Sequence, residues 1–498
     1  MERSVRTLGV LVLLLAGWSG TLAAQRKADP LAGLDQYVEQ VRQAWNLPGV
    51  AVGIVHRDSL IYAKGFGVKE IGKPDPVRPT TIFAIGSNTK SFVSTAAAML
   101  VDDKVMTWDD RVTRWLPGFQ LYDPYVTREL TLRDVLSHRS GLGRRGDPLW
   151  YGTSYSRDEI LHRIRHLTPN ASFRTEMGYQ NVMFLAAGEM VGRAAGMSFD
   201  DVVRRRIFAP LGMDNSSLST NGLAQQADVS TPHAIANGSA KPIPWRNLDN
   251  AAPAGSINSS IVEMAGYVRL HLANGVYNGK RLVSEANLAV AKTPHINSGG
   301  AGDSVSGTSS YGLGWVITTY RGARVAWHNG GIDGMLSEMW TLPDAQVGIV
   351  VLTNGSPHSA GPAIVSNIMD RFLLGAPAKD YLAEGLERNR AAAARQAEAA
   401  KRMADARVSG TRPSLPLERY AGTYTDPLYG DLSVSVDGNR LRFRWQGIDV
   451  PAEHWHFNTF RDGARSFLFQ LDADAKVSEV EVSGLATFHA KAGGPGRS

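Results

Sequence analysis

Residues 85–100 read Ile-Gly-Ser-Asn-Thr-Lys-Ser-Phe-Val-Ser-Thr-Ala-Ala-Ala-Met-Leu. A glycine followed by a run of alanine and apolar residues predicts that Ser87 lies at or near the start of a helix. Free backbone N–H groups and the helix dipole favour developing negative charge there. Lys90 lies three residues later and therefore on the same face of that helix. A buried amine loses its charge more readily, so Lys90 could accept the proton of the Ser87 hydroxyl.

Ser-x-x-Lys is a weak signal when taken alone, because a chain of this size should contain roughly one by chance. No other lysine in the sequence has a serine three positions before it. A helix-capping serine and a surface lysine would give the same pattern, so the motif by itself leaves both interpretations open.

A second cluster is Tyr179-Gln-Asn181, which precedes a helix expected from about Val182. The Tyr179 phenol could relay a proton, and the Asn181 amide could hydrogen-bond a substrate. The same residues could simply complete a helix start, which is the simpler interpretation of the tripeptide.

A third cluster is His328-Asn-Gly-Gly331, at the end of a strand expected over residues 324–327. Glycines allow a close backbone approach, so a backbone N–H could face a bound carbonyl group. A glycine turn with an incidental histidine is the alternative.

The order and spacing of the three clusters resemble the serine β-lactamase and penicillin-binding protein family. The likeness is strongest to its class C β-lactamase, D-alanyl-D-alanine carboxypeptidase and esterase branch. It covers residues 30–375, and residues 132–142, 207–213 and 253–257 also match. The stretch 132–142 contains His138, which the resemblance makes structural.

The resemblance implies that Ser87 attacks a carbonyl carbon and forms an acyl-enzyme. Lys90 and Tyr179 would share the general-base and general-acid work, with the pKa values of both groups lowered. Asn181 would hydrogen-bond the substrate amide.

The resemblance also implies roles for the third cluster. His328 and Gly330 would stand where the family more often has Lys-Thr-Gly, with His328 orienting Tyr179 or the substrate. The backbone N–H groups of Ser87 and Gly331 would form the oxyanion hole, with no cofactor and no metal. Because His328-Asn329 lacks the fixed charge and the hydroxyl of Lys-Thr, efficient penicillin hydrolysis is in doubt.

The expected function is hydrolysis of amide, peptide or ester bonds, with peptides of D-amino acids among the candidate substrates. The alternatives are a β-lactamase, or a catalytically silent penicillin-binding or sensor protein. An α/β-hydrolase, a zinc hydrolase and a P-loop nucleotide enzyme are disfavoured because Gly-x-Ser-x-Gly, His-Glu-x-x-His and Gly-x-x-x-x-Gly-Lys-[Ser/Thr] are missing from the sequence.

The expected fold of residues 30–375 is α/β (α+β): an antiparallel sheet flanked by helices, with a helical subdomain. Strands are expected at both ends of this unit, among them one over residues 311–317. Residues 376–416 read as a helical spacer that is solvated over residues 379–407. Residues 417–490 alternate in polarity around an Asp437-Gly438 turn, which predicts a small all-β domain, lipocalin-like or a partial barrel.

Residues 1–24 have the pattern of a secretory signal peptide: arginines, a short apolar run, then small residues. The chain contains no cysteine, which excludes disulfides and thiol catalysis. We therefore expect an exported protein, periplasmic or extracellular, with no stable membrane anchor after cleavage. The net charge of +6 is dispersed and does not indicate a nucleic-acid partner. The expected partner is a small peptide, amide, ester or β-lactam substrate, and the oligomeric state is not indicated.

Overall fold

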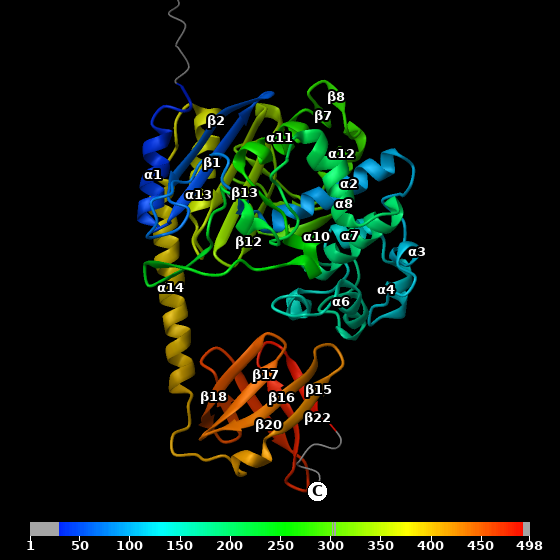
Figure 1. Cartoon of the computed structure of the whole chain (residues 1–498), viewed down its shortest axis with the longest axis vertical. Coiled ribbons are helices and arrows are strands. Elements are labelled where there is room, and N and C mark those ends of the chain that lie inside the picture. The colour runs from blue at the N-terminus through cyan, green and yellow to red at the C-terminus, as the bar shows by residue number, and fades with distance from the viewer. Residues whose placement is uncertain (1–28, 301, 303–304, 492–498) are drawn as a thin grey trace, which may run out of the picture.

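The computed structural model describes residues 29–300, 302 and 305–491, so the expected signal peptide at residues 1–24 lies outside the described residues. An α/β body and a β-barrel are joined by one long helix, α14 (Tyr381–Asp405) (Figure 1). Within the described residues, no helix combines the length and the apolar character needed to cross a bilayer.

The α/β body is built on an eight-stranded antiparallel sheet with the order β2-β1-β14-β13-β12-β11-β10-β9. The first strand, β1, pairs with β2 on one side and with the last strand, β14, on the other, which joins the two ends of this unit in one sheet, as expected. The strands are β1 (Gly49–His56), β2 (Ser59–Gly67), β9 (Ile296–Gly299), β10 (Ser309–Tyr311), β11 (Val316–Tyr320), β12 (Ala323–Ile332), β13 (Met335–Leu342) and β14 (Val347–Thr353).

One expected strand is divided in the structure. Residues 311–317 form the end of β10, a turn and the start of β11, so the prediction of one continuous strand was wrong. Gly314 adopts a left-handed backbone conformation with φ of 77°, and the N–H of Gly312 bonds to the carbonyl of Trp315. A left-handed residue cannot continue a strand, so the chain reverses here.

Helices cover both faces of the sheet. On one face, α1 (Leu34–Ala44) and α13 (Ala360–Leu374) pack against apolar side chains of β1 and β14 such as Val52 and Ile349. On the other face lies α11 (Ile261–Leu272), whose Ile261 is wholly buried. The side chains of β1 and β14 are buried on both faces, which explains their nearly continuous apolar sequence.

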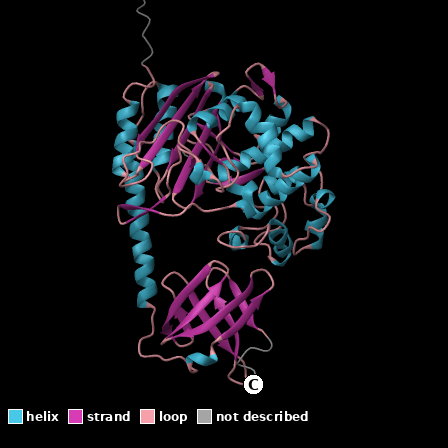
Figure 2. Cartoon of the chain, in the orientation of Figure 1, coloured by secondary structure: helices cyan, strands magenta, loops and turns pink. Residues whose placement is uncertain are grey.

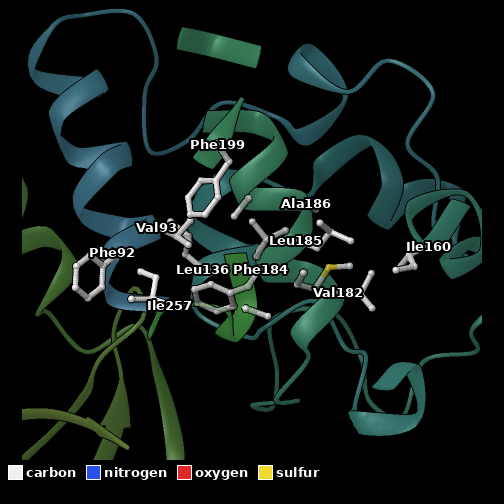
Figure 3. Packing of buried hydrophobic residues seen from close by; sticks show 14 of the residues in the cluster. Phe92, Val93, Leu136, Ile160, Val182, Phe184, Leu185, Ala186, Phe199 and Ile257 are labelled. Atoms are coloured by element: carbon white, nitrogen blue, oxygen red, sulfur yellow. The ribbon is translucent and has the colours of Figure 1, made fainter. Parts of the chain in front are cut away.

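The remaining helices form a subdomain inserted between β2 and the later strands. Its centre is a buried cluster in which Phe92 and Val93 of α2 lie near Phe184 of α7 and Phe199 of α8 (Figure 3). The helices of this region are α2 (Thr89–Asp102), α3 (Val112–Trp115), α4 (Pro124–Glu129), α5 (Leu132–Leu136), α6 (Arg157–Arg163), α7 (Asn181–Ala195), α8 (Phe199–Val203), α9 (Ala209–Leu211), α10 (Ala252–Gly255) and α12 (Glu285–Ala291). Short strand pairs accompany them: β3 (Phe83–Ala84) with β6 (Asn258–Ser259), β4 (His233–Ala236) with β5 (Ser239–Pro242), and β7 (Val276–Tyr277) with β8 (Lys280–Arg281).

The long helix α14 lies within the segment expected to be a spacer, but its first turn is not solvated. The buried Tyr381 hydroxyl donates to Asp370 of α13 and meets the Tyr320 hydroxyl at 2.8 Å. The later turns of α14 are largely exposed. The expectation of a solvated helix over residues 379–407 therefore fails at its start, because the Tyr381 side chain is buried against the α/β body.

The C-terminal domain is a closed eight-stranded barrel, β15 to β22, whose strands are magenta in Figure 2. It is closed rather than partial because the last strand pairs with the first at Tyr424 and Ala490. Aromatic side chains such as Phe443 and Phe467, stacked at 3.7 Å between ring centroids, fill its interior. The strands are β15 (Gly422–Asp426), β16 (Gly430–Asp437), β17 (Arg440–Trp445), β18 (Ile448–His456), β19 (Thr459–Arg461), β20 (Ser466–Leu471), β21 (Val477–Val482) and β22 (Ala486–Ala490).

Candidate active site

Ser87 lies in a single 3-10 turn, Gly86–Asn88, which leads directly into α2. The turn is held against the sheet by Ser337 of β13. The Asn88 amide donates to Ser337 Oγ at 2.7 Å, and that hydroxyl donates to the Ile85 carbonyl at 2.7 Å. The candidate nucleophile therefore stands at the head of a buried helix on a rigid support.

Lys90 is wholly buried, and its amine contacts three oxygens. Nζ lies 2.9 Å from Ser87 Oγ, 2.7 Å from Asn181 Oδ1 and 2.7 Å from the carbonyl oxygen of Ala254 in α10. Burial lowers the pKa of Lys90 well below its usual value. A neutral amine has two hydrogens, which Asn181 and Ala254 accept, so its lone pair is left for the Ser87 hydroxyl.

Tyr179 approaches Ser87 from the other side. Its hydroxyl donates to Ser87 Oγ at 2.9 Å. Burial raises the pKa of Tyr179 above its ordinary value. The expectation that both pKa values are lowered therefore holds for Lys90 and is wrong for Tyr179, because desolvation disfavours a phenolate as it disfavours an ammonium ion. In this geometry Lys90 can act as the base and Tyr179 as a proton donor.

Asn181, the first residue of α7, uses both ends of its amide. Its oxygen accepts from Lys90, and Nδ2 donates to Asp147 Oδ1 at 2.9 Å. The sequence interpretation assigned no role to Asp147. The Gly-Asp-Pro stretch around Asp147 reads as an ordinary loop, so no sequence pattern indicates this contact.

His328 is 2% exposed, and both of its ring nitrogens are engaged away from Tyr179. Nε2 lies 2.9 Å from the Tyr311 hydroxyl, and Nδ1 lies 2.5 Å from the carbonyl oxygen of Asn329. A carbonyl can only accept, so Nδ1 carries the proton and Nε2 accepts from Tyr311. Burial lowers the pKa of His328 to about 3, so the imidazole is neutral at physiological pH.

Gly330 and Gly331 of β12 lie directly against the turn that carries Ser87. A Cβ on Gly330 would stand 1.9 Å from the Ile85 carbonyl oxygen, and a Cβ on Gly86 would stand 2.6 Å from the Gly331 nitrogen. Only glycine permits this approach. It places the Gly331 nitrogen next to the residue before Ser87, in the region expected for the oxyanion hole.

Comparison with known proteins extends this picture. The sequence profile of the beta-lactamase family matches residues 34–368, well over half of the chain. The chain belongs to the beta-lactamase family. Residues 406–492, which include the barrel, match a domain of unknown function (DUF3471).

Relatives of this beta-lactamase-family chain include hydrolases and penicillin-binding proteins. An unguisins hydrolase of Aspergillus campestris is 29% identical over 83% of this chain and 79% of its own length. Penicillin-binding protein 4 of Amycolatopsis lactamdurans is 29% identical over 64% of this chain and 83% of its own. These matches, together with the family, make the chain a serine hydrolase.

Solved structures share the fold. The octameric penicillin-binding protein homologue of Pyrococcus abyssi superposes with a TM-score of 0.61 at 19% identity, covering 93% of this chain and 100% of its own. A class C beta-lactamase of Rhodobacter sphaeroides superposes with a TM-score of 0.56 at 19% identity, covering 68% of this chain and 99% of its own.

In this member of the beta-lactamase family, both domains line the cavity in front of Ser87. The cavity has a volume of about 700 Å³. The α/β body contributes aromatic and charged residues, and the barrel contributes residues whose position at this cavity no sequence pattern indicates. The main contributors are Arg144, Asp147, Trp150, Tyr151 and Arg246 from the body, and Trp445, Gly447, Ile448, Arg465 and Leu485 from the barrel.

His138 lies behind Tyr179 and outside this cavity lining. Its ring is buried, with its centroid 4.3 Å from that of Tyr179, and Nδ1 accepts from the backbone N–H of Gln180 at 3.1 Å. Burial lowers the pKa of His138 well below its usual value. This placement agrees with the structural role that the family resemblance implies for His138.

Proposed function

We propose that this serine hydrolase cleaves amide or peptide bonds, peptides of D-amino acids among them, through an acyl-enzyme on Ser87. The observation that carries the proposal is the position of the buried Lys90 amine, 2.9 Å from Ser87 Oγ with its hydrogens directed to two other oxygens. A base held in this way can take the hydroxyl proton as Ser87 Oγ bonds to the carbonyl carbon. The Tyr179 hydroxyl, 2.9 Å from Ser87 Oγ, is placed to protonate the leaving nitrogen.

The shape and lining of the cavity favour a substrate with sizeable side chains over a small one. Trp150, Tyr151 and Trp445 give the cavity aromatic walls on both the α/β and the barrel side. A peptide presents side chains of this size to several walls at once. A relative named as an unguisins hydrolase supports hydrolysis as the reaction class.

Hydrolysis of β-lactams is the alternative that the geometry favours less. His328, which stands where the family more often has a lysine, is neutral and buried and so offers no fixed charge to a β-lactam carboxylate. We further propose that the protein is exported, because residues 1–24 have the pattern of a signal peptide. A periplasmic or extracellular location would bring it to peptides outside the cytoplasm.

The nucleophile is tested with the full mature chain and its Ser87→Ala variant. Both are incubated with a fluorophosphonate probe and, separately, with penicillin, and adducts are measured by intact-mass spectrometry. We expect one adduct on the wild type and none on Ser87→Ala. An undiminished adduct on the variant overturns the assignment. A panel of D- and L-amino-acid amides, short acyl esters and nitrocefin then ranks the substrate classes.

A further inference from the structure

Asp147 links the catalytic residues to the barrel, and nothing in the motifs identified it. It lies in the short 3-10 segment Arg144–Leu149. Its Oδ1 accepts from Asn181 Nδ2 at 2.9 Å and from Trp150 Nε1 at 3.0 Å. Its Oδ2 lies 3.4 Å from the Arg144 guanidinium. One carboxylate oxygen is therefore committed to the residue that binds Lys90.

The chemistry of this contact fixes the orientation of the Asn181 amide. A carboxylate only accepts hydrogen bonds, so it must face the NH₂ end of the amide. The amide oxygen then faces Lys90, 2.7 Å from Nζ, as the neutral amine requires. With the amide flipped, an NH₂ group would face the amine, and the amine would lose one of its two acceptors. The second N–H of Asn181 remains available for a substrate carbonyl.

Asp147 also bears on the charge of Lys90. Its negative charge raises the pKa of Lys90, against the dominant effect of burial, and Arg144 lowers it. The other titratable groups close to Lys90 are Tyr179, whose ring centroid is 4.8 Å from Nζ, and the buried imidazoles of His138 and His328. Burial keeps all three neutral near pH 7, so Asp147 and Arg144 are the charges that set the proton affinity of the amine.

The barrel holds the segment that carries Asp147. The buried Tyr429 lies between β15 and β16, and its hydroxyl donates to the carbonyl oxygen of Arg145, two residues before Asp147. The carbonyl of Tyr429 in turn accepts from the Tyr155 hydroxyl at 2.9 Å and from Trp445 Nε1 at 2.6 Å. Figure 1 places this end of the barrel next to α6, where the Arg163 guanidinium bonds to the Pro427 carbonyl at 3.3 Å.

We propose that Asp147 is a positioning residue that orients the Asn181 amide toward Lys90, and that the barrel, through Tyr429, keeps Asp147 in place. The barrel is thus part of the catalytic apparatus as well as a wall of the cavity. This inference rests on the proposed acyl transfer at Ser87 and adds to it the groups that prepare the base.

The test measures the rate constant for acylation by the fluorophosphonate probe between pH 5 and 10, together with thermal melting, on full-length proteins. In Asp147→Asn the amide can flip, and we expect the plateau rate to fall about 10- to 100-fold. Removal of the negative charge lowers the pKa of Lys90, so the rising limb of the pH profile moves to lower pH. Asp110→Asn is the matched control, because Asp110 also accepts from a tryptophan and an arginine but lies outside the cavity lining. We expect its pH profile to match that of the wild type.

A double-mutant cycle tests the part played by the barrel. Tyr429→Phe should lower the plateau rate several-fold, whereas Tyr424→Phe, which removes a buried hydroxyl that bonds to Tyr420 within the barrel, should not. The double variant Asp147→Asn/Tyr429→Phe should react no more slowly than Asp147→Asn alone, because both changes act on one contact. Additive effects would show that the barrel acts by another route.

The outcomes separate this inference from the proposed function. If Ser87 is not labelled in the wild type, the proposed function fails. If Ser87 is labelled, but Asp147→Asn keeps the wild-type pH profile and only melts at a lower temperature, the positioning role is overturned and Asp147 is structural.

Discussion

Lys90 Nζ lies 2.7 Å from the backbone carbonyl oxygen of Ala254, a residue of α10 more than 160 positions away in the chain. This contact, and the one to Asn181, take up the two hydrogens of a neutral amine. The lone pair is thereby directed at Ser87. The structure thus prepares a base with backbone and amide oxygens rather than with a counter-ion.

The first prediction concerns the base. Lys90→Met should lower acylation by about 10²- to 10⁴-fold, the usual contribution of a general base. In the wild type, the acylation rate should rise with pH through the lowered pKa of Lys90, because only the neutral amine accepts a proton. In Lys90→Met this rise with pH should be absent. Rates of probe acylation across pH check this. Lys292→Met is the control, since Lys292 also has a burial-lowered pKa, of about 7, but packs against Trp315 instead.

The second prediction concerns the proton donor. Tyr179→Phe removes the hydroxyl that bonds to Ser87, so amides should suffer more than activated esters, whose leaving groups need no proton. We expect kcat/KM to fall about 10²- to 10³-fold for an amino-acid amide and about 10-fold for a p-nitrophenyl ester. Tyr267→Phe is the control: it removes a buried tyrosine hydroxyl that bonds to the hydroxyls of Thr95 and Ser91, and it should change neither kcat/KM value. Equal losses on both substrates would argue against proton donation by Tyr179.

The third prediction concerns the contact between β12 and the turn that carries Ser87. In Gly330→Ala the new methyl group would stand 1.9 Å from the Ile85 carbonyl oxygen and force the strand away. Displacement of the Gly331 N–H should cost about 10²- to 10³-fold in acylation, the typical effect of losing one oxyanion-hole donor. Gly118→Ala, which meets nothing within 4 Å, is the matched control. Wild-type acylation by Gly330→Ala would show that this contact is dispensable.

The fourth prediction concerns stability and pH. Burial raises the pKa of Glu338 in β13 to about 7, from 4.5 in an exposed carboxyl group. The unfolded chain then loses this proton at lower pH than the folded chain. The contribution of Glu338 to stability is therefore greatest below pH 4.5, falls as the pH rises to about 7, and levels off above it.

Glu338→Gln should remove that decline. The variant should match the wild type near pH 4.5 and be more stable by up to about 3 kcal/mol above pH 8, as measured by urea unfolding. A Glu338→Gln difference that does not change with pH would contradict the raised pKa.

Part of the site could be inferred from the sequence because it is local. Ser87 and Lys90 are three residues apart on a helix, so their proximity follows from helix geometry. The order of the three clusters resembles that of the family, and this resemblance pointed to Tyr179, Asn181 and the glycines of β12 as further site residues. The pKa of Tyr179 was predicted to be lowered and is raised, because it depends on how completely the phenol is buried, which no local sequence pattern shows.

The rest of the site depends on contacts between distant segments. Asp147, Ala254 and Tyr429 carry no motif, and each acts through a neighbour that the fold alone brings to it. The closure of the barrel depends likewise on pairing between its first and last strands. Periodicity and spacing, which are properties of the chain, predicted the helix that begins near Ser87 and the division into an α/β unit and an all-β unit, and the family resemblance pointed to Ser87 as the candidate nucleophile. The protonation states of Lys90, Tyr179 and His328, the orientation of the Asn181 amide and the cavity shared by the two domains depend on burial and on long-range hydrogen bonds. These are properties of the packed molecule, so they follow from the tertiary structure.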